Sequence, residues 1–171
     1  VLFRSKAAPK SHNPDRPEWQ KGHSSEEAEM NIAVVALDAV EPRDLLAIRS
    51  RMTHANSEWQ SETTAVLNGE ASSITPVALC HIDGGLVGWS CSHVWREMQT
   101  LEQWVDVQWR GNGIASALSS ALIAHKKLDR SKPLAVFSER TQAIARRLGF
   151  DDVRRYQHRS EEHTSELQSR V

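Results

Sequence analysis

Short apolar runs and longer amphipathic segments alternate along the middle of the chain. Apolar runs of strand length predict strands, and they occupy residues 31–37, 75–82, 86–95, 99–107, 134–137 and 152–157. Apolar residues at helical spacing predict helices, at residues 42–56, 113–128 and 141–148. Segment 57–73 is polar and fits neither pattern. The order strand, helix, three-strand meander, helix, strand, helix, strand predicts an α/β fold, of the α+β kind with a mixed sheet.

The composition limits the class of protein. The chain has 171 residues, of which 39% are hydrophobic and 25% charged, which is typical of one soluble globular domain. The formal net charge of -1 comes without a basic stripe, so we expect no nucleic-acid partner. No apolar run reaches the ~18 residues that cross a bilayer, and residues 1–30 contain no signal-peptide core. We therefore expect no membrane partner and a cytoplasmic protein.

The two cysteines flank a predicted hairpin turn at residues 83–85. One hairpin register places Cys80 opposite Val87, and the other places it opposite Trp89. Neither register pairs Cys80 with Cys91. We therefore expect two free thiols in the core, in agreement with a cytoplasmic setting.

The histidines do not predict a metal site. None of the eight is spaced like a metal ligand. Three of them, His81, His93 and His125, lie in otherwise apolar segments. We interpret these three as packing residues with satisfied hydrogen bonds.

The two ends of the chain resemble translated sequencing adapter. Residues 159–169 (RSEEHTSELQS) and residues 1–5 (VLFRS) back-translate to an adapter and to the reverse complement of its start. Residues 6–29 are polar, without a period, and end in a purine-rich coding string before Met30, like a bacterial ribosome-binding site. We expect residues 1–29 to be disordered, non-native flanking sequence, residues 30–158 to form the domain, and residues 159–171 to be an adapter-derived tail of a metagenomic fragment.

The loop Arg110-Gly111-Asn112-Gly113 leads from a predicted strand directly into a predicted helix. Its glycines allow backbone amides to turn inward, and the first N–H groups of a helix attract anions. Ser116 adds a hydroxyl donor and Arg110 a positive charge. The loop lacks the Gly-Lys-Ser/Thr of a Walker loop and the spacing of a dinucleotide fingerprint. It predicts a phosphate cradle, although a tight structural connection explains the two glycines equally well.

Three separated motifs resemble the GNAT-type N-acetyltransferase superfamily. The family's phosphate loop, Arg/Gln-x-x-Gly-x-Gly/Ala, is matched by Arg110, Gly113 and Ala115. The strand at residues 102–107 stands where the family has its acyl-CoA strand, and residues 143–150 resemble its closing helix with the Leu-Gly-Phe ending. The resemblance implies a GNAT-like acyl-CoA N-acyltransferase fold. We expect its last strand to be absent, because the adapter-like tail follows directly.

The resemblance implies acetyl transfer from acetyl-CoA to a small-molecule or peptide amine by direct attack in a ternary complex, without a metal. The residues that it assigns to acetyl-CoA are Val105, Asp106, Val107, Arg110, Gly111, Asn112, Gly113, Ile114, Ala115, Ser116 and Ser138. A backbone N–H near Val105 is expected to polarise the thioester carbonyl. Glu102 is the candidate general base, although a solvated strand-end carboxylate is an equal interpretation, and Glu97 and Glu139 are weaker candidates.

Two positions depart from the family pattern. Ala145 stands where the family often has a tyrosine acid, and Ser138 stands where it often has an asparagine. A non-catalytic CoA-binding or regulatory domain of the same fold is therefore an alternative, as is an interaction domain whose glycine loop is only structural. Four tryptophans near the expected site form either an acceptor wall or core, namely Trp89, Trp95, Trp104 and Trp109. A homodimer remains open.

Overall fold

The computed structural model describes residues 29–52 and 57–157. The adapter-like ends, and with them the expected tail and the expected loss of a last strand, lie outside these residues. Within the described ranges, no helix has the length and apolar character to cross a membrane.

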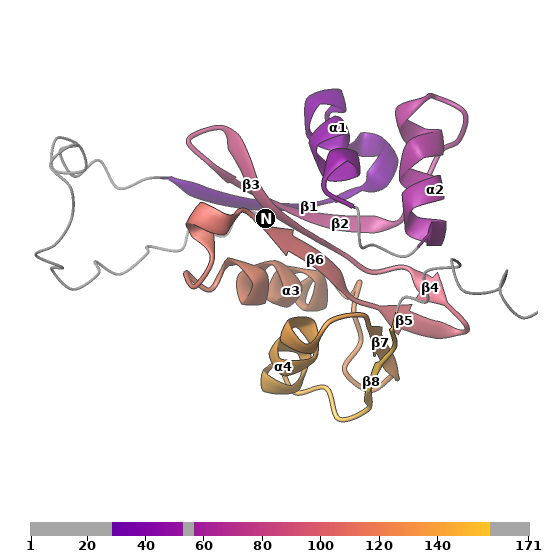
Figure 1. Ribbon diagram of the computed structural model, residues 1–171, viewed down its shortest axis with the longest axis vertical. Helices are drawn as coiled ribbons and strands as arrows, with labels where there is room; N and C mark the ends of the chain where they lie inside the picture. The colour runs from indigo at the N-terminus through magenta and orange to yellow at the C-terminus, as the bar shows by residue number, and fades with distance from the viewer. Residues whose placement is uncertain (1–28, 53–56, 158–171) are drawn as a thin grey trace, which may run out of the picture.

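The described residues form eight strands and four α-helices, whose arrangement is shown in Figure 1. In order they are β1 Met30–Ala36, the 3-10 turn η2 Leu37–Ala39, α1 Pro42–Ser50, α2 Ser57–Leu67, β2 Pro76–Ile82, β3 Gly85–Cys91, β4 Val94–Trp95, β5 Met98–Thr100, β6 Glu102–Val105, the 3-10 turn η3 Val107–Trp109, α3 Ile114–Ala124, β7 Leu134–Val136, α4 Glu139–Arg147 and β8 Val153–Arg155.

The strands form two sheets that meet near the middle of the molecule. The first is antiparallel, in the order β1-β2-β3-β6, and the second is mixed, in the order β4-β5-β7-β8, with β7 parallel to both neighbours. A backbone hydrogen bond of 3.1 Å from Leu101 N to Ala135 O joins β7 to the chain between β5 and β6. The predicted mixed α/β architecture is confirmed.

The helices cover opposite faces of the first sheet, α1 and α2 on one face and α3 on the other (Figure 1). Each face therefore has its own apolar core. The core on the α3 side includes the fully buried Leu118, Leu122 and Leu134. The core on the α1 and α2 side includes Ile48 and Trp59, both fully buried. Burial of both faces explains why β2 and β3 appear as continuous apolar runs in the sequence.

Two of the predicted strands are each divided in the structure. Segment 86–95 forms β3 and β4, and segment 99–107 forms β5 and β6 followed by η3. The division arises because the chain leaves the first sheet after β3, turns through Arg96 and Glu97, both at positive φ, and returns at β6. Apolar patterning marks burial but does not show which sheet a residue joins.

The helix boundaries also differ from the prediction. The first helix ends at Ser50 rather than at residue 56, and the ambiguous segment 57–73 contains α2. The apolar face of α2 is small: Trp59 and Thr63 are its fully buried residues. One tryptophan and one threonine do not produce a periodic signal in a polar segment.

The hairpin between β2 and β3 contains an unpredicted bulge. Its two-residue turn is Asp83 and Gly84, both at positive φ. A bulge between Cys80 and His81 shifts the register, so Cys80 lies opposite Gly88. Both expected partners, Val87 and Trp89, are therefore wrong, since neither register allowed for an extra residue. The cysteines are nevertheless free and buried, as expected.

Candidate functional site

The N-terminus of α3 presents its first N–H groups without a capping side chain from the described residues. Gly113 is the N-cap at φ 78°, where no side chain caps the helix, and the first turn carries no acidic residue. The first bond of the helix runs from Ala117 N to Gly113 O at 2.9 Å. The N–H groups of Ile114, Ala115 and Ser116 therefore have no partner within the helix. This geometry favours an anion.

The loop before α3 is fixed by its own polar side chains. Asp106 is the N-cap of η3 and accepts a 3.1 Å hydrogen bond from Gln108 N. Asn112 Nδ2 donates to Trp109 O at 2.8 Å. These bonds hold Asp106 and Asn112 to the backbone of the loop, and neither side chain lines the pocket described below.

Strand β6 ends at Val105, two residues earlier than the predicted strand. Asp106 N donates to Val87 O at 2.8 Å, so the backbone groups of Val105 point away from β3. The Val105 carbonyl accepts a 3.0 Å bond from Arg110 Nε. Val107 lies in η3, 70% exposed. The prediction of an extended edge at Asp106 and Val107 is wrong, because the Asp106 cap bends the chain.

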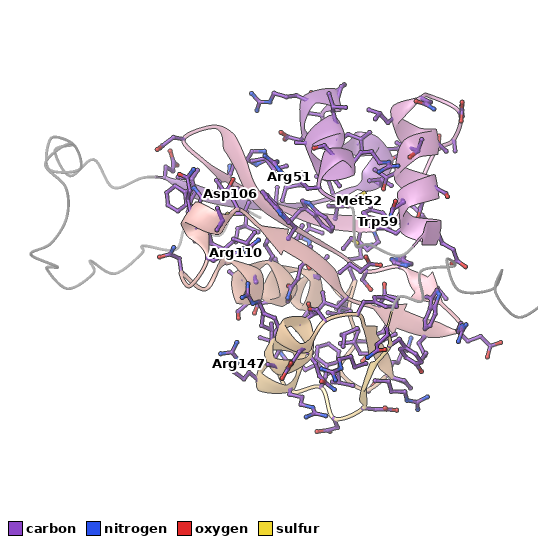
Figure 2. The ribbon with its side chains drawn as sticks, in the orientation of Figure 1. Arg51, Met52, Trp59, Asp106, Arg110 and Arg147 are labelled. Carbon is purple, nitrogen blue, oxygen red and sulfur yellow. The ribbon has the colours of Figure 1, made fainter. Side chains whose placement is uncertain are left out.

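A pocket of about 700 Å³ lies where β6, the loop, the start of α3 and one face of α4 meet. Its charged lining residues are Arg110, Arg140 and Arg147, and no acidic residue lines it within the described part of the chain. Figure 2 shows Arg110 at the loop and Arg147 on α4. A volume of this size suits a small molecule or cofactor. The charge and the free helix N–H groups suit a ligand with phosphate groups.

Eight of the expected acetyl-CoA residues line this pocket. They are Val105, Arg110, Gly111, Gly113, Ile114, Ala115, Ser116 and Ser138. Asp106, Val107 and Asn112 do not. The N-terminus of α4 also faces the pocket, where Ser138 is the N-cap and its Oγ accepts from Thr141 N at 3.1 Å. The Ser138 hydroxyl thus already has a structural role.

The sequence reasoning missed the face that α4 turns to the pocket. Its lining residues are Arg140, Thr141, Ile144 and Arg147. Positions 140, 144 and 147 follow the i, i+4, i+7 spacing of one helix face. Two arginines at that spacing, in a helix whose N-terminus is also available, are a signal that could have been read from the sequence.

Glu102 lies on the other face of β6 from the lining residues Gln103 and Val105. Its side chain is 7% exposed, and Oε1 is 3.7 Å from His93 Nε2. Of the weaker base candidates, Glu97 is in the β4–β5 turn, and Glu139, in the first turn of α4, is exposed and 3.7 Å from Arg155.

The tryptophans divide between pocket and core. Trp104 and Trp109 line the pocket. Trp89 is buried with Trp59 at a ring-centroid distance of 6.3 Å. Trp95 packs against Tyr156 at 4.9 Å.

The position matched to the family's tyrosine acid faces the core rather than the pocket. Ala145 is fully buried in the cluster beneath α3. The hydroxyl of Tyr156 donates to the Met98 sulfur at 3.8 Å, and neither residue lines the pocket. Within residues 29–52 and 57–157, no group of three or more His, Cys, Asp or Glu is close enough to hold a metal ion.

Solved structures similar to this chain are acetyltransferases. An aminoglycoside N-acetyltransferase in complex with CoA has 16% identity, covers 78% of this chain and 95% of that chain, and gives a TM-score of 0.48. A predicted acetyltransferase with acetyl-CoA from Clostridium acetobutylicum has 15% identity, coverages of 72% and 90%, and a TM-score of 0.48. A ribosomal-protein-alanine N-acetyltransferase from Brucella melitensis biovar Abortus 2308 has 20% identity, coverages of 70% and 87%, and a TM-score of 0.41.

No family model and no curated protein matches the chain. The solved neighbours belong to the class that the sequence motifs resemble. Their identities lie below 25% and their TM-scores below 0.5.

Proposed function

We propose that this protein is an acetyl-CoA-dependent N-acetyltransferase of the GNAT type. The observation that carries the proposal is the pocket formed by β6, the loop 110–113, α3 and α4, with three arginines and no acid among its described lining residues. A pyrophosphate would accept hydrogen bonds from the free N–H groups of Ile114, Ala115 and Ser116. Arg110, Arg140 and Arg147 would add charge around the phosphate groups.

The edge of β6 supports a place for the acyl-bearing arm. Backbone groups at Gln103 and Val105 point away from β3, and among the described strands β6 pairs only with β3. An extended chain of amide groups could bond to this edge as an added strand would. The N–H of Val105 would polarise a carbonyl placed there. Because Arg110 holds the Val105 carbonyl, that carbonyl would be the less accessible partner.

Glu102 is the proposed general base. An amine is protonated near neutral pH and must lose a proton before its nitrogen can attack a carbonyl carbon. Glu102 would take that proton, directly or through a water. The C–N bond then forms as the C–S bond breaks, and the second proton of the attacking nitrogen passes through a water to the departing thiolate, which leaves a neutral amide and a free thiol. A thiol has a pKa of ~8.5, so a protein acid at position 145 is not required for this step.

Titration of the full chain with acetyl-CoA by calorimetry tests the binding half of the proposal. Saturable binding supports it, and a matched titration with adenosine alone shows whether the phosphates contribute. Release of free thiol from acetyl-CoA with a panel of amines tests the transfer half. Binding without transfer to any amine would favour a second candidate, a non-catalytic CoA-binding or regulatory domain. The buried Ala145, which offers no acid to the pocket, is the observation that favours this alternative.

A further inference from the structure

His93, between β3 and β4, is a buried residue whose environment the proposed function does not explain. Its side chain is 6% exposed, and its ring stacks on Trp59 at 5.9 Å with an interplanar angle of 11°. Figure 2 shows Trp59 on the side of α2 that faces the sheet. Within the described residues, the Nε2 atom of His93 makes no hydrogen bond. The expectation that His93 is a satisfied packing residue is therefore wrong.

The other ring nitrogen of His93 is held by Thr100. Thr100 Oγ1 lies 2.9 Å from His93 Nδ1 and 3.1 Å from His93 O, and it accepts a 3.1 Å bond from His93 N. The His93 carbonyl also accepts from Thr100 N at 2.8 Å. The carbonyl therefore keeps a donor when the Thr100 hydroxyl donates to Nδ1 instead. In that arrangement the ring proton is on Nε2.

The Nε2 atom is 3.7 Å from Glu102 Oε1, and the Glu102 side chain is 7% exposed. A carboxylate taken out of water is costly unless a donor faces it. A distance of 3.7 Å is slightly too long for a hydrogen bond, and such contacts often shorten when substrate binds. His93 and Glu102 thus form a buried pair at the start of β6, on the face covered by α1 and α2.

The charge state of the ring follows from its surroundings. The charged groups near His93 are Glu102 on β6 and Glu62 on α2, and both also act on the Cys91 thiol. Burial lowers the pKa of His93 to about 4, against the opposing effect of the Glu62 charge. Glu62 is itself bonded by the hydroxyls of Ser73 and Thr75. Near neutral pH the ring is uncharged and offers one N–H.

We infer that His93 is a positioning residue for Glu102, whose carboxylate it orients and supports through Nε2–H so that the carboxylate can accept the proton of the acceptor amine. This inference rests on the proposed function for the role of Glu102 as base. The contact between His93 and Glu102 is a property of the free protein and does not depend on the proposed function. The two parts can therefore be tested separately.

Imidazole ¹⁵N NMR of the full chain tests the pairing without any substrate. The His93 signals are assigned by their absence in His93→Phe, which keeps an aromatic ring for Trp59. We expect a neutral ring with the proton on Nε2 at pH 7, and an Nε2 shift that changes in Glu102→Gln while His125 does not change. His93 spectra that are identical in the wild type and in Glu102→Gln, or a proton on Nδ1 only, would overturn the inference.

Kinetics test the consequence for the reaction. In His93→Phe we expect kcat/KM to fall about 10- to 100-fold, as for loss of a hydrogen bond to a charged group, with acetyl-CoA affinity within twofold of the wild type. The acid limb of the kcat/KM profile should move to higher pH, because the carboxylate loses the N–H of His93 beside it. His93→Gln, which keeps an N–H donor, should recover most of the rate, and His125→Phe is the control.

The two kinds of failure are distinct. A wild type that transfers acetyl to no amine contradicts the proposed function, while NMR still decides whether the pair exists. A wild type that is active, with an unchanged pH profile in His93→Phe, contradicts the role of His93 alone.

Discussion

Replacing Gly113 by alanine separates two effects of the loop before α3. Gly113 has φ 78°, and an added Cβ would have no protein atom within 4 Å. The only cost to folding is therefore the left-handed backbone, which is about 1–2 kcal/mol for a residue with a side chain. For a domain of this size that loss lowers Tm by roughly 2–8 °C. The new methyl group, however, would stand at the rim of the pocket that Gly113 lines.

Gly69 provides the matched control. It has φ 73°, also with nothing within 4 Å of an added Cβ, and it does not line the pocket. Gly69→Ala should therefore lose a similar amount of stability in thermal unfolding. In calorimetry we expect acetyl-CoA affinity to fall about tenfold or more, equivalent to ~1.4 kcal/mol, in Gly113→Ala and to remain unchanged in Gly69→Ala. Equal affinities in the two variants would refute the assignment of the loop as a phosphate cradle.

Three further predictions concern charge and burial. The pKa of His93 in the folded protein, about 4, lies below its ordinary value of 6.5, so the unfolded state binds more protons between these pH values. The free energy of unfolding should therefore fall by roughly 3 kcal/mol as the pH drops from 7 to 4. In urea unfolding, His93→Phe should show a smaller loss of free energy over the same pH range. Burial raises the pKa of Cys80 to about 11 and that of Cys91 well above its ordinary value. Neither thiol should therefore react with a thiol reagent at pH 8 until the protein is unfolded. Rapid labelling of the native protein would contradict this prediction. Arg147→Ala should weaken acetyl-CoA binding and make the affinity less sensitive to salt. The control is Arg154→Ala, because Arg154 lies outside the pocket and pairs with Asp152 at 2.8 Å; this variant should change neither quantity. Equal salt dependence in the two variants would show that Arg147 does not contact the phosphate groups.

The helix at residues 114–124 and its glycine loop could be predicted because neighbouring residues determine both of them. Gly111 and Gly113 both adopt positive φ, and an apolar face follows directly. The short strand β7 also coincides with its predicted apolar run, whereas the cap at Ser138 was not predicted, because the predicted helix began at residue 141. Local causes of this kind can be read from one sequence.

The division of two predicted strands between the two sheets could not be predicted in the same way. Whether Thr100 and Glu102 join one sheet or two depends on the backbone bond from Leu101 to Ala135, more than thirty residues away. The bulge at Cys80 likewise depends on how β3 meets β2. Such long-range pairing carries no local hydrophobic signal.

The pairing of His93 with Glu102 illustrates the same limit within the candidate site. Glu102 could be chosen as a base from the motif, but the partner lies on a separate strand connection. His93 lies close to Glu102 because the chain leaves the first sheet through β4 and β5. Its ring stacks on Trp59, which belongs to α2, a helix that the apolar pattern did not predict. A histidine in an apolar segment gives no sign of the side chain that it will face.

The most direct measurement of the central claim is calorimetric titration of the full chain with acetyl-CoA, on protein shown to be folded by a cooperative thermal transition. The account predicts saturable one-to-one binding that weakens with salt and with Gly113→Ala but not with Gly69→Ala. The absence of binding by the folded protein at millimolar acetyl-CoA would contradict it.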